Sequence, residues 1–143
     1  MTMKKLMIAA AIGLTAFIIY SEANREPRER INYAQALPEA PAFEVSSNFD
    51  GQWEGKRIDI SGDNICLETR ILGSIEEGKV SLRLMYNNTL LKGWIADDGK
   101  LELYSNNERW GYDFKGTAQN GQIDGEWKVS NAPCRGSWKV VKV

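Results

Sequence analysis

The sequence predicts an all-β fold: a single small antiparallel up-and-down β-barrel of about eight strands over residues 48–143. Two observations predict it. Short runs rich in Val, Ile, Leu, Trp and Tyr alternate with polar residues, and clusters of Gly, Asn and Asp separate the runs about every ten residues, which is typical of β-sandwiches and barrels. No separator is long enough to hold a crossover helix, so consecutive strands should pair antiparallel.

The strands are expected where apolar and polar residues alternate. Val80, Leu82 and Leu84 share one face and oppose polar neighbours, as in a strand with one face in a core and the other in water. In chain order, the expected strands are 51–60, 65–72, 79–86, 89–96, 100–105, 110–117, 122–129 and 134–142. The separators contain pairs such as Asp98-Gly99 and Asn120-Gly121, which tolerate the positive φ angles of tight hairpins.

The first expected strand does not alternate simply. Trp53 and Ile58 are five residues apart, so an ideal strand would place them on opposite faces. A β-bulge at Gly55-Lys56 would bring both side chains inside. We favour this interpretation because buried charges are costly unless they are paired. The alternative is a charged interior lining made by Arg57, Asp59, Glu68 and Arg70.

A short Gly-x-Trp pattern occurs three times, as Gly51-Gln-Trp53, Gly125-Glu-Trp127 and Gly136-Ser-Trp138. Glycine in a strand leaves room where another group approaches the backbone closely. We interpret the pattern as a packing motif in which each glycine accommodates a neighbouring indole. A surface on which these tryptophans stack against a ligand is the less favoured interpretation.

Residues 1–23 have the pattern of a secretory signal peptide. Lys4-Lys5 precede an apolar run over 6–20, and Ser21-Glu22-Ala23 follow with small residues at the first and third positions. The apolar run is shorter than the ~20 residues that a membrane-spanning helix needs, and an uncleaved N-terminal anchor is the alternative. Residues 24–47, which contain three prolines and mixed charges, are interpreted as a flexible linker.

The charge balance limits the partners that are expected. The formal net charge is −1, and it becomes −2 without residues 1–23, which hold Lys4, Lys5 and Glu22. A basic patch, the electrostatic sign of nucleic-acid binding, is therefore not expected. The remaining partners are an unknown protein, a glycan or a small ligand, with a membrane only if the N-terminal segment stays uncleaved. The signal pattern predicts a periplasmic or secreted location in a bacterial envelope.

The chain has two cysteines, Cys66 and Cys134, and an even pair in an exported protein predicts a disulfide. Both should lie at the same end of the barrel, on the two strands that flank the first one. Those strands are about 9–10 Å apart, whereas a disulfide tolerates Cα separations only to about 7 Å. The bond is therefore expected to cross the end of the first strand near Ile60, or the barrel to narrow there.

Histidine is absent from the sequence. Its absence removes the commonest general base, the usual zinc ligand and every Ser-His or Cys-His nucleophile. Adjacent acidic pairs such as Asp97-Asp98 should sit in turns and point apart, so neither a glycosidase carboxylate pair nor a calcium site is expected from them. We therefore expect a protein that is not an enzyme and that has no cofactor and no metal site.

An up-and-down meander brings alternate turns to the same rim. The turns after the first, third, fifth and seventh strands form an Asn/Ser rim, and the other turns form an acidic rim from which the linker should leave. Amide side chains both donate and accept hydrogen bonds, so they suit sugars or peptide backbones. The candidate ligand-binding residues on the Asn/Ser rim are Tyr86, Asn87, Asn88, Asn106, Asn107, Arg109 and Trp110. The alternative is that these asparagines only form tight turns.

The segment Phe49-Asp-Gly-Gln-Trp53-Glu-Gly55, with a cysteine shortly after it and Cys134-Arg-Gly-Ser-Trp138 near the end, resembles small secreted bacterial β-barrel domains of uncharacterised function. The Gly51-x-Trp53 start is also similar to lipocalin- and avidin-type barrels, although the C-terminal helix of a lipocalin is missing. The resemblance implies an exported, disulfide-stabilised binding or interaction module. Secreted lysozyme inhibitors share the size, the barrel and the disulfide, so the alternative is an inhibitor of an envelope or foreign enzyme such as a lysozyme.

Overall fold

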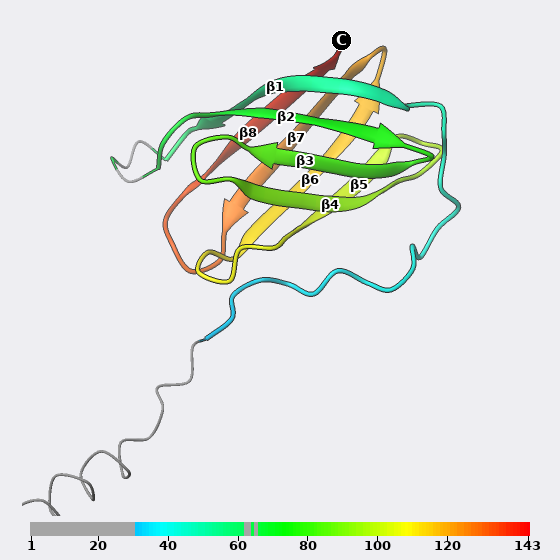
Figure 1. Ribbon diagram of the computed structural model, residues 1–143. Helices are drawn as coiled ribbons and strands as arrows, with labels where there is room; N and C mark the ends of the chain where they lie inside the picture. Colours follow the sequence, from blue (N-terminus) through cyan, green and yellow to red (C-terminus); the bar gives the residue numbers. More distant parts are fainter. Residues whose placement is uncertain (1–30, 62–63, 65) are drawn as a thin grey trace, which may run out of the picture. The chain divides into compact units, whose positions relative to one another are not determined.

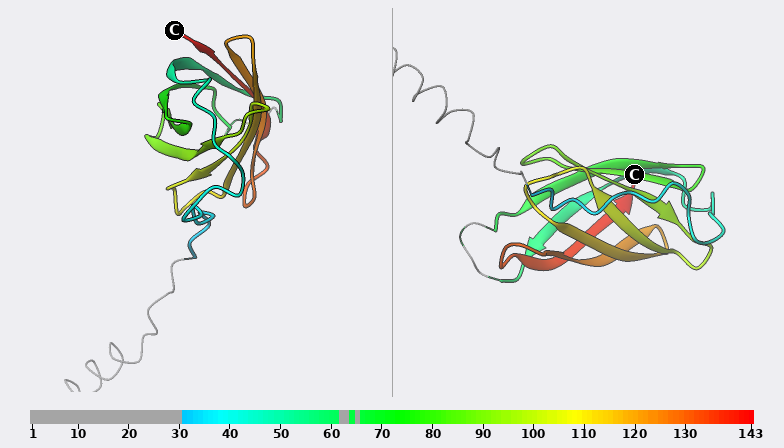
Figure 2. Two further views of the ribbon diagram at one scale, coloured as in Figure 1. Left: turned by 90° about the vertical axis from the view of Figure 1, so that its right-hand side faces the viewer. Right: turned by 90° about the horizontal axis from the view of Figure 1, so that it is seen from below.

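Eight antiparallel strands form one closed barrel in the computed structural model, which describes residues 31–61, 64 and 66–143. Each strand is hydrogen-bonded to the next along the chain, and β8 closes the ring on β1 (Figures 1 and 2). The strands are β1 (Gly51–Asp59), β2 (Thr69–Glu76), β3 (Lys79–Leu84), β4 (Thr89–Ile95), β5 (Lys100–Ser105), β6 (Tyr112–Gln119), β7 (Gln122–Val129) and β8 (Arg135–Lys142). The predicted all-β up-and-down barrel of about eight strands is confirmed.

Some expectations lie outside the described residues. They are the signal peptide or uncleaved anchor at 1–23, the linker as far as residue 30, and part of the turn after β1, at residues 62, 63 and 65. Within the described part of the chain, no helix is long and apolar enough to cross a membrane.

Two of the hairpins at the acidic rim have the geometry that their turn residues favour. Glu77 and Gly78 join β2 to β3 with φ angles of 50° and 74°, and Asn120 and Gly121 join β6 to β7 with 54° and 74°. Positive φ at both central residues matches the right-handed twist of the flanking strands. These tight turns fix the register of the hairpins, so that inward-facing residues of neighbouring strands lie side by side.

The Gly-x-Trp pattern is explained by the pairing of β7 with β8. Trp127 lies opposite Gly136 and Gly125 lies opposite Trp138, so each indole occupies the space above the other strand's glycine. A Cβ on Gly125 would come within 2.3 Å of the Trp138 indole nitrogen, and one on Gly136 within 2.9 Å of the Trp127 indole nitrogen. Trp53 similarly faces Gly73 across β1 and β2. The packing interpretation is confirmed for Gly125 and Gly136, whereas the group that lies against Gly51 is the Lys142 side chain and not an indole.

The bulge expected at Gly55-Lys56 is wrong. β1 pairs with β2 in an unbroken register that includes Gly55 opposite Ile71 and Arg57 opposite Thr69. Ordinary alternation therefore carries Arg57 inside with Trp53, at 2% exposure, and turns the partly buried Ile58 outward. The charged lining also fails as a whole, because Glu68 and Arg70 are exposed. Arg57 is the member of that set whose side chain the structure shows inside.

Two expected strands are displaced toward the C-terminus. β2 was expected at 65–72 but spans 69–76, because a two-residue turn to β3 requires β2 to continue to Glu76. β6 was expected at 110–117 but spans 112–119. The Asn107 side chain accepts hydrogen bonds from the backbone N–H groups of Arg109 and Trp110, at 3.0 and 3.1 Å, and this holds both residues in the preceding loop.

Residues 31–47, called here the strap, follow the outside of the barrel from one rim to the other (Figure 1). The backbone N–H of Tyr33 donates to the Glu108 carbonyl at the Asn/Ser rim, at 2.8 Å. Ser46 N–H donates to the Ile95 carbonyl at the opposite rim, at 2.9 Å. The chain thus enters β1 from the acidic rim, as expected. The described part of the predicted linker does not stay at that rim, however, because the strap, followed back toward the N-terminus, returns to the Asn/Ser rim at Tyr33.

Candidate functional site

The Asn/Ser rim carries the most distinctive pocket of the molecule. It is formed by the loops β1–β2, β3–β4, β5–β6 and β7–β8, which meet at one end of the barrel (the left end in Figure 1). A cavity of about 350 Å³ opens there, within the range of about 300–1,000 Å³ typical of ligand sites. We call it the mouth pocket, and its lining is Arg57, Cys66, Tyr86, Arg109, Trp110, Tyr112, Val129, Ala132 and Cys134.

The predicted disulfide forms part of the pocket wall. Cys66 and Cys134 are bonded, with their Cα atoms 5.4 Å apart. Cys66 precedes the first residue of β2 and belongs to the β1–β2 loop, while Cys134 directly precedes β8. Because the loop carries Cys66 past the end of β1, the bond forms at an ordinary Cα separation. The disulfide ties the two loops that border β1 and fixes this side of the pocket.

Arg57 enters the pocket from inside the barrel. Its guanidinium carbon lies 4.1 Å from the centroid of the Trp127 ring and 4.9 Å from that of Tyr86. One terminal nitrogen donates to the Leu67 carbonyl at 2.5 Å. Its Nε is buried and has no hydrogen-bond partner among the described atoms. Aromatic faces attract the cation, but the Nε–H of Arg57 still has no acceptor among the described atoms.

Two tyrosines form the side of the pocket next to Arg57. The hydroxyl oxygens of Tyr86 and Tyr112 are 2.5 Å apart, and the Asn87 amide donates to the Tyr112 hydroxyl at 3.1 Å. Burial, followed by the hydrogen bond with Tyr86, raises the pKa of Tyr112 to about 12. Tyr112 is therefore neutral at physiological pH and presents a hydroxyl rather than a negative charge to the guanidinium.

A second arginine stands at the entrance. The Arg109 guanidinium carbon lies 5.2 Å from the centroid of the Trp110 ring, and both residues line the mouth pocket. Arg109 is exposed and Trp110 is partly buried. The pocket therefore has one cation at its rim and another in its interior, with aromatic surface between them.

The predicted asparagines mostly build the rim. Asn106 accepts from the Leu90 N–H, Asn88 accepts from Arg83 and has a φ of 62°, and Asn107 bonds three groups. Among the candidate residues, Tyr86, Arg109 and Trp110 line the pocket. Asn87 does not line it but donates a hydrogen bond to Tyr112, which does. The structure thus gives Asn88, Asn106 and Asn107 a role in turn formation.

Sequence reasoning missed four lining residues: Arg57, Tyr112, Val129 and Ala132. Arg57 carried a usable signal, because plain alternation from Trp53 places it inside. Tyr112 and Val129 belong to the buried core, and the pocket is a continuation of that core. Ala132 lies in the β7–β8 loop and gave no signal.

Exposed apolar side chains border the same end of the barrel. Ile60 and Leu67 in the β1–β2 loop are 68% and 55% exposed, and Met85 and Tyr86 after β3 are 45% and 44% exposed. Large apolar residues gathered around a pocket are typical of contact surfaces.

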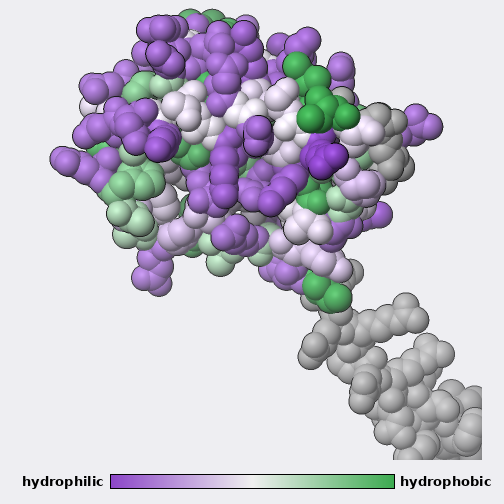
Figure 3. Space-filling view, turned by 180° about the vertical axis from the view of Figure 1, so that it is seen from behind, coloured by the Kyte–Doolittle hydropathy of each residue, from purple (hydrophilic) through white to green (hydrophobic). Residues whose placement is uncertain are grey.

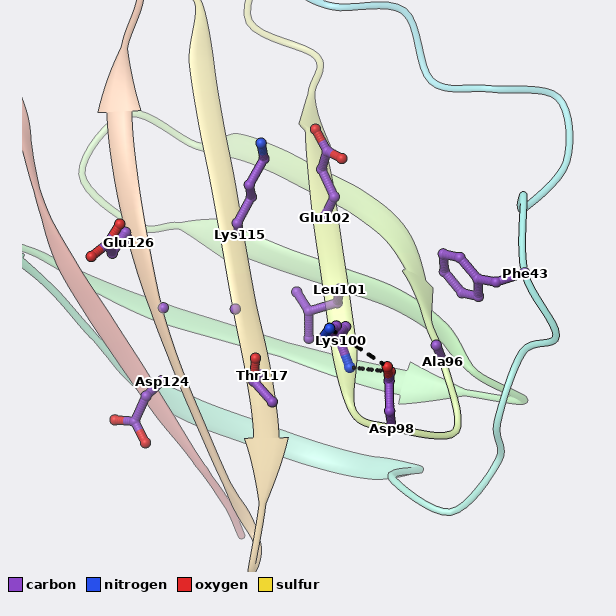
Figure 4. A pocket seen from close by; sticks show the side chains of 12 residues that line it. Phe43, Ala96, Asp98, Lys100, Leu101, Glu102, Lys115, Thr117, Asp124 and Glu126 are labelled. Atoms are coloured by element: carbon purple, nitrogen blue, oxygen red, sulfur yellow. Dashed lines mark hydrogen bonds and ion pairs between the residues drawn. The ribbon is translucent and has the colours of Figure 1, made fainter.

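A second hollow lies on the outer wall of the barrel, beneath Phe43 of the strap (Figure 4). Its lining alternates in charge, with Lys115 on β6 between Glu102 on β5 and Glu126 on β7. The outer face seen in Figure 3 is likewise mainly hydrophilic, with scattered hydrophobic side chains. Mixed charges are ordinary on a surface that faces water, so we do not regard this hollow as a candidate ligand site.

No protein family, curated protein or solved structure matches this chain. The described residues contain no group of three or more His, Cys, Asp or Glu side chains able to hold a metal ion. The mouth pocket is the candidate functional site, and its described chemistry consists of two guanidinium groups, neutral phenols, an indole and a disulfide.

Proposed function

We propose that this protein is an exported, non-enzymatic binding module, periplasmic or secreted, whose binding site is the mouth pocket. The observation that carries the proposal is a pocket at a loop-built barrel end with a buried arginine inside it. Most ligand sites are apolar clefts with a few fixed polar groups, and the pocket has this composition. The disulfide supports a location in an oxidising compartment.

A second candidate is an inhibitor that docks on another protein through the same rim. The exposed Ile60, Leu67, Met85 and Tyr86 favour it, because they would give a protein partner an apolar contact surface around the pocket. In this case, the pocket would receive a side chain of the partner. Both candidates use the Asn/Ser rim, and they differ in the size of the partner.

The test is to immobilise the mature protein and to identify the partner that it captures from envelope extract, with elution in the presence and absence of added glycans. Ala132→Trp should fill the mouth pocket and abolish capture, because Ala132 lines it. The matched control replaces Asp97 and Asp98 by asparagine at the acidic rim, where asparagine keeps the turn chemistry, and it should capture normally. Recovery of one stoichiometric protein would favour the inhibitor. Loss of capture only in the acidic-rim variant would contradict the choice of site.

A further inference from the structure

The interior of the mouth pocket holds a positive charge for which the described residues supply no counter-charge. Arg57 is 2% exposed. The described ion pairs are Lys100–Asp98 and Lys128–Asp113, and neither involves Arg57. A buried charge is stable when it is paired and its hydrogen-bonding groups are satisfied. Among the described groups, Arg57 instead contacts ring faces, the Leu67 carbonyl and the hydroxyl of neutral Tyr112.

The charged residues in the described lining of the pocket are both positive. Among the described residues, no aspartate or glutamate lines it, and Arg109 adds a second cation at the entrance. The buried Nε–H of Arg57 has no acceptor among the described atoms. A guanidinium presents its N–H groups in a planar fork that matches a carboxylate, and such hydrogen bonds are stronger than neutral ones. The missing acceptor is therefore expected to be an anion.

The rest of the pocket is suited to an apolar body. Trp110, Tyr86 and Val129 supply ring and aliphatic surface, and the volume of about 350 Å³ accommodates a ring system or a short chain. The Tyr86–Tyr112 hydroxyl pair adds neutral hydrogen-bonding groups beside the guanidinium. An acid group and a small apolar body together would use all of these features.

We propose that the mouth pocket binds a small organic carboxylate with an aromatic or aliphatic body. Its acid group meets Arg57 and Arg109, and its body lies against Trp110, Tyr86 and Val129. This inference rests on the proposed function and adds the chemical class of the ligand. It excludes a neutral sugar as the preferred occupant, because a sugar would leave both guanidinium charges without an anion.

The experiment uses three acids, benzoate, 2-naphthoate and octanoate, each compared with its primary amide by titration calorimetry. At least one acid should bind about tenfold or more tightly than its amide, since a hydrogen bond to a charged group contributes about 1.5–3 kcal/mol. The nitrogen-15 resonance of the Arg57 Nε–H should shift with the acid and not with the amide. Raising the salt concentration should weaken the binding of the acid and leave the binding of the amide unchanged.

Three variants locate the effect. Arg57→Met keeps an unbranched side chain as far as the Nε position but has no charge, and it should abolish the preference for the acid, with folding checked by near-ultraviolet circular dichroism. Arg109→Gln removes an exposed charge at the entrance, leaves the core untouched, and should reduce the preference severalfold. The matched control, Arg70→Gln, removes an exposed charge that does not line the pocket, and it should bind like the unmodified protein.

Two results would overturn the inference and leave the proposed function to its own test. One is equal affinity for acid and amide, which would make the pocket a neutral apolar site. The other is the absence of millimolar binding by all three acids while Ala132→Trp still abolishes capture of the envelope partner. If capture were also unaffected by Ala132→Trp, the proposed function itself would fail.

Discussion

Buried side chains at single positions show how the barrel interior is divided. Toward the acidic rim, Trp53 closes the barrel, and its indole N–H donates to the Phe49 carbonyl at 3.0 Å. In the middle, Phe114 lies 6.2 Å from Trp127 and 5.8 Å from Trp138, measured between ring centroids. Toward the Asn/Ser rim, Arg57 ends the apolar interior, and the pocket begins there.

Trp127 is the residue whose removal should cost most. It is 2% exposed, stacks on Phe114 and donates its indole N–H to the carbonyls of Ile58 and Ser137. Trp127→Ala should lower the free energy of unfolding by roughly 3–5 kcal/mol, as aromatic truncations in packed sites do. Urea denaturation measures the loss. A loss under about 1 kcal/mol would mean that the indole does not fill the core.

Tyr112 should make stability depend on pH at the alkaline end. Its pKa rises from 10.0 to about 12 on folding because burial, followed by the Tyr86 hydrogen bond, favours the neutral phenol. Between those values the unfolded chain has released a proton that the native chain keeps, so the unfolding free energy should fall as pH rises. This contribution is complete below pH 10 and lost above about 12.

The measurement for Tyr112 is urea denaturation at several pH values from 9 to 11.5, compared between the unmodified protein and Tyr112→Phe. The variant cannot ionise at this position and should lose stability less steeply with pH. Tyr104, whose pKa is also raised, mainly by burial, remains in both proteins and so cancels from the comparison. Equal slopes would contradict the assignment.

Whole elements are held by contacts that join distant parts of the sequence. Asp50, at the end of the segment leading into β1, accepts hydrogen bonds from the backbone N–H groups of Glu77 and Gly78, at 2.7 and 3.0 Å. The bridge between Val45 and Ala96 holds the strap beside the end of β4. The β2–β3 hairpin is thus fixed from outside by residues that the sequence pattern assigned to a linker and its junction.

Asp50→Ala should therefore destabilise the barrel although Asp50 is only partly buried. It removes two charge-assisted hydrogen bonds to turn N–H groups, and a loss of about 2 kcal/mol is expected. The control is Asp97→Ala on the same rim, whose side chain makes no hydrogen bond among the described residues, and which should cost less than about 0.5 kcal/mol. Thermal denaturation of both variants gives the comparison, and similar losses would argue against the turn contact.

At the scale of the whole molecule, closure of the ring and the disulfide act together. Eight strands without a free edge leave few routes for partial opening. The Cys66–Cys134 bond spans a sequence separation of 68 residues. It also joins the two loops beside β1, whose two edges are paired with β2 and β8.

Reduction of this bond should lower stability by roughly 4 kcal/mol in the chain-entropy description. For a domain of this size that corresponds to a fall of about 15–30 °C in Tm. The measurement is thermal denaturation with and without reductant, with the double variant Cys66→Ala, Cys134→Ala as the control that reductant should not affect. The protein isolated without reductant should contain no free thiol, and two titratable thiols in the undenatured protein would disprove the pairing.

The class of the fold, the number of strands, the two rims and the cysteine pair could all be predicted from the sequence. These depend on local properties: alternation with a period of two, turn residues that accept positive φ, and connections too short for helices. Which of the rim residues form a pocket depends on contacts between distant parts of the chain. Arg57 is an example. Because an unpaired buried charge is costly, reasoning from the local pattern places its side chain outside. In the structure, three rings and a carbonyl from other strands and loops surround the guanidinium and stabilise it inside. The strap is the second case, since its path depends on backbone partners at Glu108 and Ile95 that no local pattern in residues 31–47 indicates.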